Sequence, residues 1–184
     1  MKIRFISPFS FERNRHGFPN IGLEYNTVIN ELPDDCWVVL TDQDVLFLTS
    51  DTANHIKEII EANPEYDLIT CVTNRLGVKE QLINGQFMEG DISHQIKVAK
   101  TSWQDHGTTV IPTRLAAGLC MIFRKSLWQN VGGFPEFDIT FDRVFSQKVI
   151  KSGGKIGISK GLYIFHLYRY QEKNPQNSIK HLTK

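Results

Sequence analysis

The sequence has 184 residues, of which 41% are hydrophobic and 22% are charged, and its 21 Lys and Arg nearly balance its 20 Asp and Glu, leaving a formal net charge of +1. This length and composition are typical of one globular domain with its own core. The balanced charge argues against a nucleic-acid-binding protein, which would carry a basic surplus or a basic stripe.

The sequence contains neither a candidate membrane span nor a cysteine framework. Its longest apolar runs, Val45–Leu48 and Gly118–Phe123, are far shorter than the roughly 20 residues that a membrane-spanning helix needs. Cys36, Cys71 and Cys120 form no Cys-x-x-Cys pair, so neither a zinc ribbon nor a set of disulfides is indicated. We therefore expect a cytoplasmic protein with reduced cysteines.

Apolar residues in short continuous runs predict strands, and apolar residues spaced three and four apart predict helices. In chain order, the expected elements are a strand at 2–7, a loop at 8–20, a helix at 21–32, a strand at 37–40, a helix at 51–62, a strand at 68–72, an irregular segment at 74–90, a helix at 92–103, a loop at 104–116, a strand at 119–123, a short helix at 125–131, a helix at 141–152, and strands at 155–159 and 162–166.

This alternation predicts a single α/β domain over residues 1–170, with a mixed, mainly parallel sheet flanked by helices, followed by a polar tail at 171–184. Ligands of such sheets bind beyond the carboxyl ends of the strands. The residues that follow each strand are therefore the first candidates for a site.

Two carboxylates, Asp42 and Asp44, follow the buried strand at 37–40. Side chains two residues apart in an extended chain lie on the same face, so both acids can reach one cation. Mg²⁺ and Mn²⁺ prefer carboxylate, phosphate and water oxygens. The pair is a candidate metal site for a diphosphate ligand, the alternative being that the acids cap the following turn.

Two further residues strengthen this interpretation. Asp142 stands at the start of a helix after Gly132-Gly133-Phe134, and His166 ends an apolar strand. Taken singly, the first is typical of a helix cap and the second of a structural histidine. Together with Asp42 and Asp44 they supply metal ligands and a general base, which glycosyl transfer requires.

In their order along the chain, Asp42-Gln43-Asp44, Gly132-Gly133-Phe134 with Asp142, and His166 resemble the landmarks of inverting, family-2-like glycosyltransferases of the GT-A fold. The segment Asn20–Asn26 resembles the helix that precedes the Asp-x-Asp strand in that family, and the resemblance covers most of residues 1–170. It implies a GT-A-like (Rossmann-like) domain. It also implies metal-dependent transfer of a sugar from a nucleotide-sugar to a hydroxyl acceptor, such as a saccharide, with inversion.

The resemblance also implies a role for each matching position. Asp44 and His166 correspond to ligands of a divalent ion, Mn²⁺ or Mg²⁺, that neutralises the departing diphosphate. Asp42 corresponds to the acid nearer the sugar or ribose of the donor, beside the same ion. Asp142 corresponds to the base that deprotonates the acceptor.

Further donor-binding candidates follow the first strand and lie on the next helix. Ser7 and Pro8 resemble the opening turn of the donor site, and Asn26 stands where the family places a residue beside the nucleotide. Arg75, which follows the strand at 68–72, is a candidate for contacting the donor phosphates or the acceptor, the alternative being a surface turn.

The sequence departs from the family pattern at two places. Phe141 precedes the expected base, where the family commonly has a Glu. The family's second strand, with an Asp that reads the nucleotide base, has no counterpart, because the loop at 8–20 runs almost directly into the helix. In that loop Arg13, Asn14, Arg15 or His16 are the candidates to replace it.

Two alternatives stay open at this point. The first is a carbohydrate- or nucleotide-binding pseudoenzyme that retains the fold without turnover, which the abbreviated base pocket favours. The second is a nucleotidyltransferase, although the Gly-rich phosphate loop expected after its first strand is missing.

Overall fold

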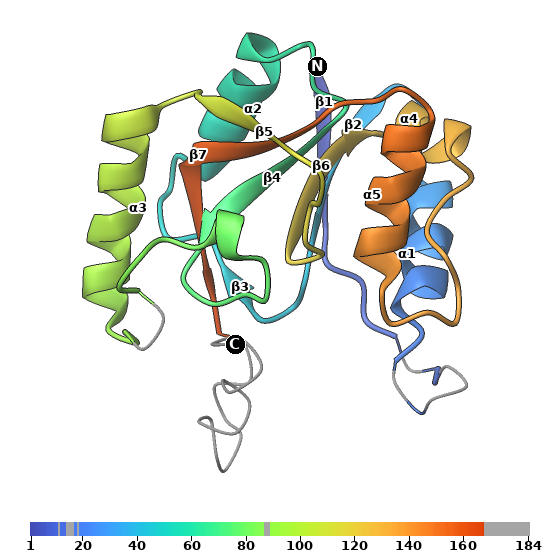
Figure 1. The fold of residues 1–184 in the computed structure, drawn as a ribbon, viewed down its shortest axis with the longest axis horizontal. Helices are drawn as coiled ribbons and strands as arrows, with labels where there is room; N and C mark the ends of the chain where they lie inside the picture. The colour runs from blue at the N-terminus through green and yellow to red at the C-terminus, as the bar shows by residue number, and fades with distance from the viewer. Residues whose placement is uncertain (11, 14–16, 18, 87–88, 168–184) are drawn as a thin grey trace.

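The computed structural model describes residues 1–10, 12–13, 17, 19–86 and 89–167 and is drawn in Figure 1. Its strands are β1 (Lys2–Ile6), β2 (Cys36–Thr41), β3 (Val45–Leu46), β4 (Leu68–Thr73), β5 (Val110–Thr113), β6 (Cys120–Arg124) and β7 (Ile156–His166). Its helices are α1 (Ile21–Asn30), α2 (Thr52–Ala62), α3 (Ile92–His106), α4 (Lys125–Asn130) and α5 (Phe141–Lys151), with a short 3₁₀ helix, η1, at Lys79–Gln81.

The described strands form one mixed sheet in the order β1-β2-β6-β4-β7-β3, and β5 pairs with β7. The α/β class and the flanking helices are therefore as predicted, but the expected predominance of parallel pairing is wrong. Only β1–β2 and β4–β7 are parallel neighbours, because β6 lies antiparallel between β2 and β4, and β3 and β5 pair antiparallel with β7. Alternation of strands and helices along a sequence does not reveal that a later strand inserts between two earlier ones.

The pairing places many chain segments at one edge of the sheet. Because β6 is antiparallel to both β2 and β4, the strands β1, β2, β4 and β7 all run in one direction. Their carboxyl ends therefore meet at a single edge, and the amino end of β6 lies at that same edge. Figure 1 shows the ends of β4 and β7 approaching β3 in the lower half of the view.

The core lies on both faces of the sheet. β2 is buried along its whole length, and its side chains alternate between the two faces. Val38 and Leu40 pack with Tyr25 and Phe145 under α1 and α5, whereas Val39 packs under α2 with its isoleucines. A smaller cluster beside α3 contains Tyr163 and Phe165 of β7. Helices on both faces leave the edge with the carboxyl ends as the natural place for a ligand.

Strands β5 and β7 differ from the sequence prediction. The expected loop at 104–116 contains β5, whose Pro112 suits a strand that is paired on one side only. The two strands expected at 155–159 and 162–166 are one continuous strand, β7. Its pairing with β4 shifts in register, since Cys71 is opposite Ser159 while the next residue, Val72, is opposite Tyr163.

Candidate active site

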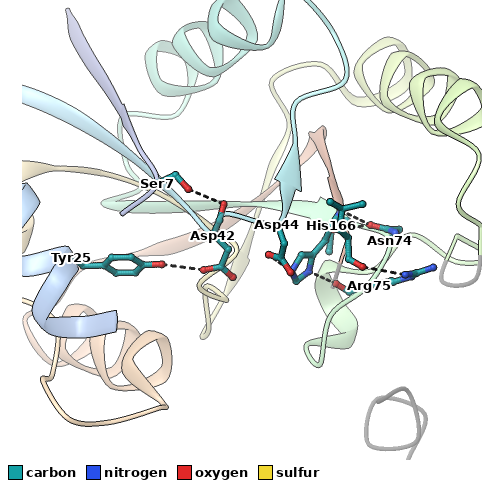
Figure 2. Close-up of polar contacts among 9 residues, drawn as sticks. Ser7, Tyr25, Asp42, Asp44, Asn74, Arg75 and His166 are labelled. Carbon is teal, nitrogen blue, oxygen red and sulfur yellow. Dashed lines mark hydrogen bonds and ion pairs between the residues drawn. The ribbon is translucent and has the colours of Figure 1, made fainter. Parts of the chain in front are cut away.

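Asp42, Asp44 and His166 form a compact group at this edge. Each offers one ligand atom, and these atoms all lie within 4.8 Å of one another. Figure 2 shows Asp42 and Asp44 after β2 and His166 at the end of β7. The two segments meet because β3 pairs with β7, which sets Val45 opposite His166, and because the Leu167 N–H donates to the Asp44 carbonyl at 2.8 Å.

His166 is held from its backbone and from its ring. Its N–H donates to Asn74 Oδ1 at 2.8 Å, and its Nδ1 lies 2.7 Å from the carbonyl oxygen of Arg75. A carbonyl only accepts hydrogen bonds, so Nδ1 carries a proton and Nε2 faces Asp44 Oδ1 at 3.2 Å. In the neutral ring Nε2 is therefore the atom available to a metal ion.

The charges of the group shift the pKa values of its members. Burial alone would lower the pKa of His166, but the hydrogen bond and charge of Asp44 outweigh it, and the pKa is raised. For the partly exposed Asp44, burial works to raise the pKa, yet His166 lowers it overall. Burial raises the pKa of Asp42, with a further contribution from the charge of Asp44. Two neighbouring carboxylates that repel one another suit a divalent cation.

The ligand atoms of Asp42, Asp44 and His166 suit a divalent cation. Two carboxylates and one imidazole nitrogen are a mixed oxygen and nitrogen set, which suits Mn²⁺, whereas Mg²⁺ more strongly prefers oxygen. The Arg75 carbonyl, which accepts from His166 Nδ1, is the kind of outer-shell partner that orients metal-binding histidines. The three residues predicted as metal ligands therefore lie close together, and their side chains are of the types that bind divalent ions.

Asp142 lies in the first turn of α5, at the same edge. Its Oδ2 accepts from the Gly118 N–H at 3.1 Å and its Oδ1 from the Arg143 N–H at 2.6 Å. Burial raises the pKa of Asp142, although these two hydrogen bonds oppose the shift. The charge of Asp142 in turn contributes to raising the pKa of Asp42. The carboxylate is therefore oriented by the backbone and lies within electrostatic range of the metal group.

Phe141 occupies the position where a Glu was expected because the structure needs a core residue there. Its ring packs edge-on against Tyr25 at 5.3 Å between centroids. It also approaches the backbone before β6 closely, since a Cβ at Gly118 would lie 2.5 Å from the Phe141 ring. This contact brings the Gly118 amide to the Asp142 carboxylate.

A cavity of about 330 Å³ adjoins the metal group. Its lining residues come from the segment after β1, from α1 and from the segment after β2, and they are Pro8, Phe9, Ser10, Pro19, Ile21, Tyr25, Asp42, Gln43 and Asp44. Ser7 also reaches this region, because its Oγ donates to the Asp42 carbonyl at 3.1 Å. The structure thus brings the expected donor-site residues Ser7 and Pro8 to Asp42.

Sequence reasoning missed Tyr25, Phe9 and Gln43 as residues of this site. Tyr25 falls on the apolar face of α1, so its spacing indicated only a core residue. Phe9 and Gln43 stand in connecting segments without periodicity, and the one signal for them is that they flank Pro8 and the Asp-x-Asp pair.

Asn26 and Arg75 are placed differently from the residues above. Asn26 Nδ2 donates to the Phe134 carbonyl at 2.9 Å, and its Oδ1 accepts from the Phe134 N–H at 2.9 Å and from Trp128 Nε1 at 3.0 Å. Its side chain joins α1 to the segment after α4 and does not line the cavity beside Asp42. The buried Arg75 guanidinium donates to the Leu167 carbonyl at 3.2 Å, where it supports the end of β7.

Of the four candidates to replace the base-reading strand, Arg13 is exposed and pairs with Pro19 in an isolated antiparallel bridge. Asn14, Arg15 and His16, like the tail at 171–184, lie outside the described residues.

Comparison with known proteins gives a structural relative. No protein-family model matches the sequence, and no curated protein matches it by sequence. Among solved structures, the mannosyltransferase PcManGT from Pyrobaculum calidifontis, in complex with GDP-Man and Mn²⁺, is similar to 88% of this chain with 20% sequence identity and a TM-score of 0.51. The chain has a GT-A-like fold. It spans 41% of the length of that mannosyltransferase chain.

The helices that the structure describes include none with the length and apolar character of a membrane span. The cytoplasmic location remains a prediction from the sequence.

Proposed function

We propose that the protein is a glycosyltransferase that moves a sugar from a nucleotide-sugar to a hydroxyl acceptor, with a divalent ion held by Asp42, Asp44 and His166. The observation that carries this proposal is the convergence of these three ligand atoms within 4.8 Å, beside a cavity, on a GT-A-like fold. Mn²⁺ and GDP-mannose are the first ion and donor to test, because the structurally similar mannosyltransferase was solved with both.

The reaction is a single displacement at the anomeric carbon. The acceptor oxygen forms a bond to that carbon while the bond to the donor diphosphate breaks, so the configuration inverts. When bound, a divalent ion neutralises negative charge on the departing diphosphate. Ser7 and Pro8 border the donor beside Asp42.

Asp142 takes the proton of the acceptor hydroxyl. The Gly118 and Arg143 amides hold its carboxylate in one orientation, which leaves a lone pair on each oxygen free for the acceptor. Burial raises the pKa of Asp142. A carboxylate with a raised pKa is a stronger base at neutral pH, provided that it remains ionised.

Two residues expected to contact the donor are better suited to supporting roles. Asn26 forms hydrogen bonds with Phe134, Trp128 and Glu136. The Arg75 guanidinium donates to Leu167 beside the metal group. We propose that Arg75 contributes to donor binding by holding the segment that carries His166.

Thermal unfolding with a panel of nucleoside diphosphates and nucleotide-sugars, each with Mn²⁺, Mg²⁺ or EDTA, tests the donor site. A ligand at 100 times its Kd adds about 2.7 kcal/mol to the stability of the folded state. We expect one nucleotide class to stabilise the protein only with metal. Asp44→Ala removes this effect, whereas Asp51→Ala, at the start of α2, keeps it. Equal stabilisation in EDTA, or in Asp44→Ala, would contradict the proposed metal site.

A binding protein without turnover is the second candidate function. The observation that favours it is that both oxygens of Asp142 already accept backbone hydrogen bonds, as in a purely structural acid at a helix start. Release of nucleoside diphosphate in the presence of saccharide acceptors separates the two functions. Donor binding without such release, with every acceptor tried, would favour the binding protein.

A further inference from the structure

Tyr25 connects helix α1 to the metal group. Its side chain is 2% exposed, and its hydroxyl donates to Asp42 Oδ1 at 3.1 Å. Figure 2 shows the ring extending from α1 with the hydroxyl directed at this carboxylate. A tyrosine placed only for packing would bury its ring equally well without this contact.

The Tyr25 ring has little freedom to move. It lies edge-on against Phe134 at 5.5 Å and against Phe141 at 5.3 Å between ring centroids. Phe134 is itself joined to α1 through the two hydrogen bonds of Asn26. The hydroxyl is therefore held at a fixed point in the wall of the cavity beside Asp42.

The backbone of Asp42 is also held. Its N–H donates to the Leu119 carbonyl at 3.2 Å, and its carbonyl accepts from Ser7 Oγ at 3.1 Å. The remaining freedom of this residue is rotation of its side chain, and the hydrogen bond from Tyr25 restricts that rotation. His166 is oriented in a comparable way by Asn74 and Arg75.

We infer that Tyr25 is a positioning residue whose hydroxyl orients the Asp42 carboxylate for the divalent ion. This inference rests on the proposed function, since it assigns the metal to Asp42, Asp44 and His166. Because Tyr25 also packs on Phe141, which precedes Asp142, the same side chain links the metal ligand to the helix that carries the proposed base.

Tyr25→Phe tests the inference, because it retains the ring contacts and removes only the hydroxyl. Loss of an outer-shell partner typically weakens metal binding about 10–100-fold. We expect a loss of this size in a titration of the protein with Mn²⁺ alone, followed by the electron paramagnetic resonance signal of the free ion. In assays of nucleotide-sugar binding, an excess of Mn²⁺ is expected to restore donor binding by the Tyr25→Phe variant.

Tyr163→Phe is the matched control. Tyr163 is buried on β7 and its hydroxyl donates to Oε1 of Gln95 in α3, so this change also removes one hydrogen bond of a buried tyrosine hydroxyl. We expect both variants to lose stability but only Tyr25→Phe to lose Mn²⁺ affinity. Unchanged affinity in Tyr25→Phe, or equal losses in both variants, would overturn the inference while leaving the metal site in place.

Wild-type protein that binds no Mn²⁺ would overturn the proposed metal site and the inference with it. A second measurement avoids any dependence on the folding of the variant. With ¹³C-labelled tyrosine rings, addition of Mg²⁺ to the wild-type protein is expected to move the Cζ resonance of Tyr25 and not that of Tyr163. A Tyr25 resonance that does not respond to bound Mg²⁺ would contradict the inference.

Discussion

The Asp142 carboxylate has two roles. It anchors the backbone before β6 through Gly118, and it is the proposed proton acceptor. General-base catalysis needs a carboxylate that is both oriented and accessible. The two backbone amides orient the Asp142 carboxylate, and each of its oxygens keeps a further lone pair that can accept a proton.

Replacing this base separates binding from chemistry. We expect Asp142→Asn to lower the rate of sugar transfer by about 10²–10⁴-fold, the usual contribution of a general base, with donor affinity nearly unchanged. Product formation at saturating donor and the thermal shift with donor are the two measurements. Asp91→Asn, at the N-cap of α3, is the control for losing a carboxylate at a helix start. Full transfer activity in Asp142→Asn would show that another group takes the proton.

Asp42 makes the metal-free protein sensitive to pH. Burial raises its pKa above the ordinary value of 3.8, so the folded protein holds this proton more tightly than the unfolded chain does. The stabilisation is present below the unfolded pKa and is lost as the pH rises through the folded pKa. Asp44, His166 and Asp142 are the charged groups that act on it.

We therefore expect Asp42→Asn to be more stable than the wild type at neutral pH in EDTA, with a smaller difference below pH 4. Denaturant unfolding at several pH values measures this. Asp35→Asn should show the opposite sign, because Lys2 lowers the pKa of the exposed Asp35. An Asp42→Asn variant that is less stable than the wild type at neutral pH would contradict the expectation.

Among the elements, the turn after β4 fixes the end of β7. Asn74 and Arg75 accept hydrogen bonds from the backbone and the ring of His166, and the Arg75 guanidinium donates to Leu167. These hydrogen bonds connect the carboxyl ends of the parallel strands β4 and β7, where the metal group forms.

Asn74→Ala leaves the buried N–H of His166 without its acceptor. We expect a loss of about 1–3 kcal/mol in the free energy of unfolding, together with weaker Mn²⁺ binding because the histidine is less well oriented. Denaturant unfolding and a Mn²⁺ titration measure the two effects. Asn84→Ala, at an exposed position, is expected to change neither. Weakened stability with unchanged Mn²⁺ affinity would limit the turn to a structural role.

The approach of α5 to the start of β6 depends on a glycine. Gly118→Ala places a Cβ 2.5 Å from the Phe141 ring, so we expect a loss of about 1–3 kcal/mol from overpacking and a displacement of Asp142 that lowers transfer. The double variant Gly118→Ala/Phe141→Leu makes room for the methyl group, and recovery of stability and activity would verify the cause. A single variant with wild-type stability would refute it.

At the scale of the whole molecule, sequence reasoning identified the elements that depend on local pattern. β2 and β4 are continuous apolar runs, and Ile56, Ile59 and Ile60 repeat at helical spacing. The direction of β6 and the existence of β3 and β5 depend on pairing between distant segments, which no local pattern encodes.

The residues of the candidate site were likewise predictable only where a local sequence pattern marks them. Asp42, Asp44 and His166 stand at strand ends, where the chemistry of a sheet edge is expected, so the sequence could single them out. Tyr25 could not be found in this way, because a tyrosine on an apolar helix face has the same spacing whether its hydroxyl has a partner or not. Asn26 shows the reverse case, since its place in a familiar segment did not reveal its bonds to Phe134.

The change of register within β7 determines how far this strand reaches. Three extra residues lie between the partners of Cys71 and Val72, which corresponds to roughly 10 Å of extended chain. In an unbroken register Thr73 would be opposite Gly161, and the imidazole would stand well beyond the sheet. The irregularity thus takes up three residues of β7, so that His166, rather than Tyr163, lies two residues beyond the partner of Thr73, at the level of the metal group.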